Sequence, residues 1–288
     1  MALIALIAVT AVWGVTFVQV KDAVEVYPLF AFLAVRYAIA AGVLGFAGVP
    51  RVRSLGRSGL AAGAVLGVLG ALGIGLQTAG LERTTVSSTG FITGLYVVLT
   101  PLFGLALFRT QVGLEVWAGV ALSIAGLGML SGVHVGSTTG DALVLVSTSA
   151  QALQIVMVER YARRFDAVAL TMVAMVTSSA GFLVLALARD DLPLPHGWTV
   201  WGALLVTGVF ASALAVLIQV WAQRRMSAAR IALVFALETV WAGIFGYWLS
   251  GDRLGWLGWG GCAAILAGIV LAEPAAAAVL RAVISRSR

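Results

Sequence analysis

The chain has 288 residues, of which 61% are hydrophobic and only 10% are charged. Soluble domains carry about 25% charged residues, so this composition excludes a water-soluble globular protein and indicates an integral membrane protein. The net charge of +6 does not indicate nucleic-acid binding, because the basic residues lie between apolar segments. The single cysteine, Cys262, excludes an internal disulfide and a cysteine metal cluster.

Ten apolar segments are long enough to cross a bilayer, since a spanning helix needs about 20 mostly apolar residues. The predicted spans are residues 2–20, 28–49, 60–80, 86–108, 113–132, 140–159, 167–188, 198–222, 229–250 and 255–273. The first segment has no basic residues before it, so it is interpreted as a span and not as a secretory signal. Ten spans place both termini on the same side of the membrane.

The basic residues predict which side that is. One set of loops carries Arg51, Arg53, Arg57, Arg109, Arg160, Arg163, Arg164, Arg224, Arg225, Arg230, Arg281, Arg286 and Arg288. The loops of the opposite set carry only Lys21, Arg83, Arg189 and Arg253. Cytoplasmic loops collect Lys and Arg, so we expect the first set and both termini to be cytoplasmic.

The two halves of the chain resemble each other. The stretch from Trp117 to Gly126 matches the stretch from Trp259 to Gly268, and residues 95–101 align with residues 233–239 if the loop at 250–258 takes up a spacing difference. Five spans per half reverse the direction of the second half, an arrangement typical of secondary transporters. The predicted fold is an all-α integral membrane protein with ten transmembrane helices in two inverted five-helix repeats, residues 1–134 and 135–288. Chance similarity between apolar helices is the alternative.

Two charges, Arg36 and Glu238, lie deep within predicted spans. A charge at the middle of a membrane helix costs about 3 kcal/mol on insertion scales, so such a residue usually faces a partner or a water-filled path. Counted from the helix ends, the two residues differ in height by only about 6 Å. They are expected to pair directly or to share a polar cavity; a purely structural tether is the alternative.

Uncharged polar residues follow the same helices. One face of the fourth span is polar, with Thr89, Thr93, Tyr96 and Thr100. One face of the sixth span is polar as well, with Ser147, Gln151 and Gln154. Gln77 and Gln219 lie toward the ends of the third and eighth spans. Pro101 frees a backbone carbonyl in the fourth span. Such faces indicate a cavity, although hydrogen bonding between helices explains any one of them. Trp13 and Trp241 are candidate aromatic lining, with packing or lipid contact as the alternative.

Enzyme signatures are absent from the sequence. The only lysine, Lys21, follows no glycine-rich loop, which excludes a phosphate-binding P-loop. No metal-ligand spacing or nucleophile motif occurs either. We therefore expect no enzymatic activity, no metal and no cofactor.

Several of these stretches together resemble one family. The first span reads Trp13-Gly-Val-Thr-Phe17, the second holds the single Arg36, and residues 89–101 and 232–238 match the ends of that family's two repeats. In their order and spacing they resemble the EamA-type transporters of the drug/metabolite transporter superfamily. Two departures occur: Thr239 replaces the usual proline after Glu238, which removes the expected cause of a kink, and Asp252 replaces a usual glutamate.

The resemblance implies ten helices, with the fifth and tenth spans peripheral, and a carrier that moves small metabolites, often exporting amino acids. We accordingly expect a multi-pass protein of the bacterial inner membrane that works by alternating access. The predicted substrate-binding residues are Trp13, Thr16, Arg36, Gln77, Thr93, Tyr96, Gln151, Gln154, Glu238 and Trp241.

The charges suggest the substrate. Arg36 suits a carboxylate and Glu238 an ammonium group, as in a zwitterionic amino acid or a similar metabolite. An alternative role of Glu238 is to carry a coupled proton. Other functions also fit the sequence: a drug or nucleotide-sugar carrier of the same fold, a channel, or a non-transporting membrane scaffold.

Overall fold

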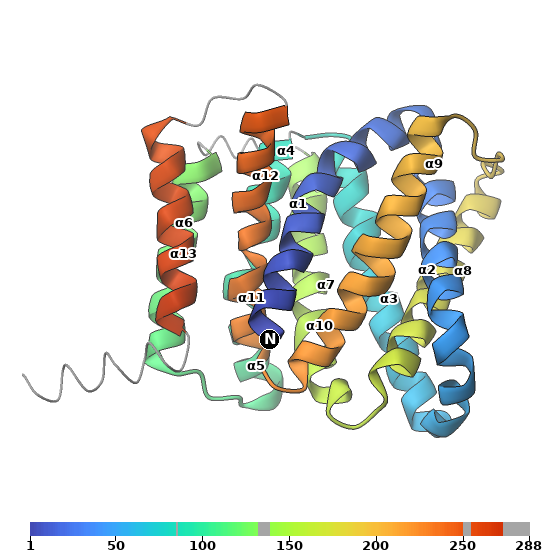
Figure 1. The fold of residues 1–288 in the computed structure, drawn as a ribbon, viewed down its shortest axis with the longest axis horizontal. Helices are drawn as coiled ribbons and strands as arrows, with labels where there is room; N and C mark the ends of the chain where they lie inside the picture. The colour runs from blue at the N-terminus through green and yellow to red at the C-terminus, as the bar shows by residue number, and fades with distance from the viewer. Residues whose placement is uncertain (85, 132–138, 250–254, 273–288) are drawn as a thin grey trace, which may run out of the picture.

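The computed structural model describes residues 1–84, 86–131, 139–249 and 255–272, which are helical with short connections and contain no strand (Figure 1). The all-α prediction is thus confirmed for these residues. The elements are α1 (Ala2–Val26), α2 (Leu29–Val52), η1 (Arg53–Leu55), α3 (Gly56–Leu81), α4 (Val86–Gly94), α5 (Tyr96–Phe108), α6 (Leu114–Ser131), α7 (Thr139–Ala162), α8 (Ala167–Ala188), α9 (Trp198–Leu205), η2 (Val206–Leu214), α10 (Ala215–Gln223), α11 (Ala228–Phe235), α12 (Leu237–Leu249) and α13 (Trp256–Ala272).

Six helical runs of the described residues are long and apolar enough to cross a membrane. They are Ala2–Val26, Leu29–Leu81, Ser88–Phe108, Thr139–Ala162, Ala167–Ala188 and Trp198–Gln223, and the shorter apolar helices Leu114–Leu130 and Trp256–Ala272 accompany them. The run Leu29–Leu81 contains the predicted second and third spans, joined by the 3-10 turn η1 and by Gly56, whose φ of 61° suits glycine. The count of ten spans stays a prediction.

The first helix is longer than its predicted span of residues 2–20, because it continues to Val26. It ends where Tyr27 adopts an extended conformation immediately before Pro28, as expected for a residue that precedes proline. The predicted end was too early because it was set by the end of the apolar run, which stops before Lys21.

Two helical runs are interrupted near their middle. The first breaks at Leu95, between α4 and α5, and the second at Ala236, between α11 and α12. At the second break the Ala236 N–H is shared between the carbonyls of Ala232 and Leu233, each at 3.2 Å. The discontinuity is therefore present although Thr239 replaces the usual proline.

A third irregularity is the π-helix η2, between α9 and α10. The wider turn of a π-helix shifts the side chains that follow it and is frequent at functional sites.

The helices form a main bundle with α6 and α13 side by side at one edge (Figure 1). In the bundle, α2 packs on α8 and η2, α3 packs on α7 and α8, α1 packs on α9, α10 and α12, and α4 and α5 pack on α7. At the edge, a Cβ placed on Gly119 would lie 2.5 Å from the Gly268 carbonyl oxygen, and one on Gly126 would lie 2.6 Å from the Gly261 carbonyl oxygen. These pairings make α6 and α13 antiparallel neighbours whose backbones touch.

Large apolar side chains cover the outside of the helices. Phe46 is 97% exposed, and Val68, Leu183 and Val270 are exposed as well. Contiguous apolar surface of this kind is unfavourable in water and is expected for a bundle surrounded by lipid.

Candidate functional site

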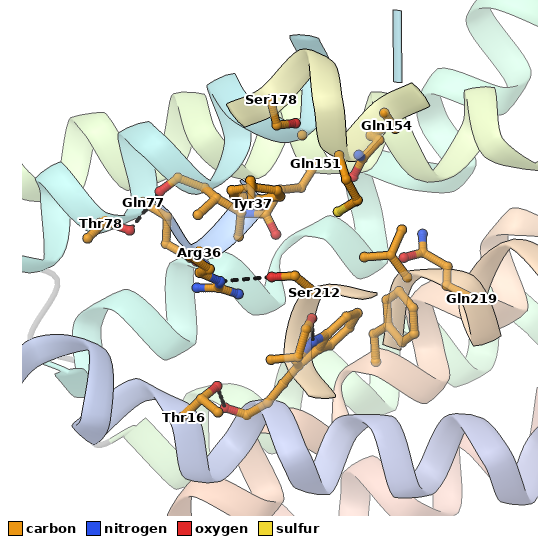
Figure 2. A pocket seen from close by; sticks show the side chains of 18 of the residues that line it. Thr16, Arg36, Tyr37, Gln77, Thr78, Gln151, Gln154, Ser178, Ser212 and Gln219 are labelled. Carbon is orange, nitrogen blue, oxygen red and sulfur yellow. Dashed lines mark hydrogen bonds between the residues drawn. The ribbon is translucent and has the colours of Figure 1, made fainter. Parts of the chain in front are cut away.

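A pocket lies in the interior of the main bundle, between helices from both halves of the chain (Figure 2). Its volume is about 110 Å³. A cavity needs about 10–15 Å³ of such volume to hold one water molecule, so the pocket has room for several water molecules or a small solute. Most of the predicted substrate-binding residues line it, namely Trp13, Thr16, Arg36, Gln77, Tyr96, Gln151, Gln154 and Glu238.

Arg36 enters the pocket from α2 and is only 7% exposed. Its Nε donates a hydrogen bond of 2.8 Å to the Ser212 hydroxyl oxygen, which belongs to η2 (Figure 2). Within the described residues this is the only hydrogen bond of the guanidinium group, so its two terminal nitrogens remain available. Paired terminal nitrogens match the two oxygens of a carboxylate.

Glu238 enters the pocket from the first turn of α12, two residues after the break at Ala236. It is half-buried, and within the described residues its carboxylate takes part in no hydrogen bond or ion pair. The ion pair found in the described part of the chain joins Glu159 of α7 to Arg163, which follows the end of that helix. Arg36 and Glu238 therefore do not pair directly in this conformation; they share one cavity, which is the other arrangement that the sequence analysis considered.

Three glutamines reach the pocket from two helices, α3 and α7. Gln77 of α3 donates to the Thr93 hydroxyl at 2.9 Å, Gln151 of α7 donates to the Ser147 hydroxyl at 2.9 Å, and Gln154 donates to the Leu66 carbonyl at 3.0 Å. These bonds hold the amides in place. The amide oxygens accept no hydrogen bond from the described residues, so they are left as acceptors that a solute can use.

Aromatic rings form another part of the wall. The Trp13 indole nitrogen donates to the Ala211 carbonyl of η2 at 2.9 Å, and the Trp13 ring lies edge-on to Phe235 at 4.8 Å between centroids. Tyr96 meets the same Phe235 ring at 6.3 Å, again edge-on. The neighbouring Thr16 hydroxyl is used within its own helix, since it donates to the Trp13 carbonyl.

Two predicted residues are not among those that line the pocket. Thr93 is buried behind Gln77, whose amide it anchors. Trp241 stacks on Phe245 at 5.9 Å, and its indole nitrogen is buried with no hydrogen-bond partner.

Several lining residues were not predicted from the sequence, in particular Tyr37, Thr78, Ser178, Ser212 and Phe235. Gln219, a polar residue of the eighth predicted span that was not assigned to the site, lines the pocket as well. Ser212 had no signal in the sequence, because a lone serine in an apolar segment is unremarkable. Its role depends on the π-helix, which the sequence did not predict.

The pocket is closed at one end of the bundle. The basic end is defined here as the end where Arg109, Arg160, Arg224 and Arg230 lie. There, α7 is tied to α10 and α11: Gln223 donates to the Ile155 carbonyl at 2.7 Å, Arg224 donates to the Ala162 carbonyl at 2.7 Å, and the Ala228 N–H donates to Glu159 at 2.8 Å.

Toward the opposite end the lining continues along α1 and α3, through Val20, Thr78 and Leu81. Within the described residues, α7 packs on α10 and α11, but α1 makes fewer contacts with α3 and with α4. The pocket therefore extends away from the basic end.

Comparisons with known proteins agree with this architecture. Residues 1–132 and 138–273 each match the EamA-like transporter family. A protein of Archaeoglobus fulgidus named as an uncharacterized transporter is 32% identical over 240 residues, which cover 82% of this chain and 74% of that protein. Another so named, from Synechocystis sp., is 25% identical over 224 residues, which cover 70% of this chain and 67% of that protein.

A protein crystal structure superposes with a TM-score of 0.78 at 19% identity and covers 96% of this chain and 98% of that one, a likeness of fold alone. The family matches, together with the apolar helical runs, identify a multi-pass membrane protein of a transporter family. The chain belongs to the EamA-like transporter family.

Proposed function

We propose that the protein is a secondary carrier that moves a small zwitterionic metabolite, an amino acid in the first place, through the pocket by alternating access. The observation that carries the proposal is a pair of opposite charges, Arg36 and Glu238, that line one interior pocket without pairing with each other. An arginine with free terminal nitrogens binds a carboxylate, and the glutamate binds an ammonium group. A solute with both groups compensates both charges, which lowers the cost of keeping them inside a membrane.

The proposed architecture is two inverted five-helix repeats, residues 1–134 and 135–288. The packing supports it, because exchanging α1 for α7, α2 for α8, α3 for α9–η2–α10 and α4–α5 for α11–α12 reproduces the main contacts. At the edge, the exchange converts the pair Gly119–Gly268 into Gly261–Gly126. The two adjacent family matches agree with the same division.

The helix boundaries favour a different alignment of the repeats from that in the sequence analysis. Helix α4 begins at Val86 and α11 begins at Ala228. The interval between these two residues equals the interval between Trp117 and Trp259. With this constant interval no loop has to absorb a shift, and Glu238 corresponds to Tyr96 instead of Thr100. Gln219 likewise corresponds to Gln77, so both pairs of related residues line the pocket.

The packing suggests how alternating access works in this chain. The contacts of α7 with α10 and α11 close the basic end, whereas the counterpart contacts of α1 with α3 and with α4 are weaker among the described residues. Under inverted symmetry, the other state exchanges the two sets. If the basic end is cytoplasmic, as the distribution of arginines predicts, this conformation is closed toward the cytoplasm of a bacterial cell, with both termini on that side.

The proposal is tested by counterflow in proteoliposomes that contain the purified protein and an unlabelled amino acid. Saturable uptake of labelled amino acid is expected, reduced at least about tenfold by Arg36→Gln and by Glu238→Gln, since each removes a charge-assisted contact. Arg57→Gln and Glu25→Gln are matched controls, because both residues are exposed and outside the pocket.

The rival functions give other outcomes. Counterflow of drugs or nucleotide sugars, and not of amino acids, rejects the substrate class. Flux that does not saturate indicates a channel, and no flux of any solute indicates a scaffold. Proton coupling by Glu238 is tested separately: it predicts that Glu238→Gln abolishes the dependence of transport on a pH gradient.

A further inference from the structure

A second cavity lies at the basic end and shares no lining residue with the central pocket. It is enclosed by the ends of α5 and α7, the beginning of α11 and the connection between α5 and α6, and its volume is about 430 Å³. Counted along α5 from Phe108 back to Thr100, it reaches about 12 Å into the bundle. We infer that this cavity is a binding site for a phosphate group, carried by an anionic lipid or by free phosphate.

The charges of the cavity favour an anion. Its lining contains Arg160, Arg163, Arg164 and Arg230 against two carboxylates, Glu115 and Glu159. Glu159 is already committed, because it accepts hydrogen bonds from Arg163 at 3.1 Å and from the Ala228 N–H at 2.8 Å. The excess of guanidinium groups is therefore uncompensated by the protein.

The inner part of the cavity holds polar groups without a partner. Thr100 is 0% exposed and its hydroxyl makes no hydrogen bond, and the Nε of Arg230 is buried and equally without a partner. An unsatisfied buried donor costs roughly 1–3 kcal/mol, so these two groups gain from any acceptor that enters. A cluster of arginines alone would be weak evidence for a ligand. The unpartnered polar groups of Thr100 and Arg230 are a second, independent observation that points to one.

The mouth of the cavity suits a phosphate group in particular. Arg160, Arg163 and Arg164 are exposed there, and Arg160 stacks on Phe108 with its Cζ 4.5 Å from the ring centroid. Guanidinium groups match phosphate oxygens with paired N–H donors. The basic end of a membrane bundle also lies at the depth of the lipid headgroups, where basic pockets between helices bind anionic lipids.

The test measures binding of two probes to the purified full-length protein. One arm titrates inorganic phosphate into protein held in nanodiscs of neutral lipid; the other titrates phosphatidylglycerol into detergent-solubilised protein without phosphate and counts bound lipids by native mass spectrometry. Saturable binding in at least one arm is expected, and the arm that responds identifies the source of the phosphate group.

Variants locate the site. Arg230→Gln is expected to weaken the responding probe by about tenfold or more, since it removes a charge-assisted contact. Arg57→Gln, which removes one exposed arginine outside the cavity, should leave binding unchanged. Thr100→Val keeps the proposal testable if Arg230→Gln does not fold: it removes only a hydroxyl that has no partner, and it too should weaken binding. No saturable binding in either arm, or binding that Arg230→Gln and Thr100→Val leave unchanged, overturns the inference.

Discussion

The contact between α6 and α13 permits a quantitative prediction about Gly126. A methyl group at this position would lie 2.6 Å from the Gly261 carbonyl oxygen and 2.8 Å from the Ile265 Cγ1 atom. Side-chain rotation cannot relieve the first clash, because the carbonyl belongs to the backbone. The helices must separate by a good part of an ångström before the methyl group reaches ordinary van der Waals contact, so Gly126→Ala amounts to overpacking.

Overpacking of this kind typically costs about 1–3 kcal/mol. For a chain of this size, each kcal/mol corresponds to about 2–4 °C in Tm. Gly126→Ala is therefore expected to lower the Tm of the purified protein in detergent by several degrees, as followed by size-exclusion fluorescence after heating. Counterflow of the protein that remains folded should be unchanged, because α6 and α13 do not line the central pocket.

Gly45→Ala is the matched control. Gly45 lies within α2, and a Cβ placed on it meets nothing within 4 Å. The same chemical change there avoids any clash and gains helix propensity of roughly 0.5–1 kcal/mol, so the Tm should stay the same or rise. Equal Tm values for Gly126→Ala and Gly45→Ala would refute the close backbone contact between α6 and α13.

Three further predictions concern single contacts. Ser212→Ala removes the hydrogen-bond partner of Arg36 and should raise the half-saturation concentration in counterflow by roughly 5–30-fold, with Tm nearly unchanged; an unaltered value would exclude a positioning role. Gln223→Leu removes the donor to the Ile155 carbonyl and should loosen the basic end, measured as faster hydrogen exchange of the neighbouring amides; protection equal to the wild type would contradict the proposed closure. Asp166→Ala removes the N-cap of α8 and should cost about 1 kcal/mol, whereas Asp166→Asn should largely retain it; identical Tm values for both would count against capping.

Much of the bundle follows from the sequence because burial in a bilayer leaves a long-range apolar pattern. The deep charges were similarly visible: Arg36 and Glu238 each interrupt an apolar segment, and both line the pocket. The contacts that support the proposed repeats could not be predicted from the sequence, because residues such as Gly119 and Gly268, which touch in the structure, are far apart in the chain.

What the sequence did not predict is local backbone geometry. The π-helix η2, which supplies Ser212 and the Ala211 carbonyl, leaves no signature in an apolar segment. The break at Ala236 also forms without the proline that usually marks it. Trp241 was expected as aromatic lining, but its ring stacks on Phe245 and it is not among the residues that line the pocket.

The most direct measurement of the central claim is the competition of substrate analogues in counterflow, with one charged group of the amino acid removed at a time. For the wild type, both the carboxamide analogue and the deaminated analogue should compete poorly. Arg36→Gln should lose the discrimination against the carboxamide alone, and Glu238→Gln the discrimination against the deaminated analogue alone. If both variants keep the wild-type order of competition, the two charges do not bind the two ends of the solute, and the account is wrong.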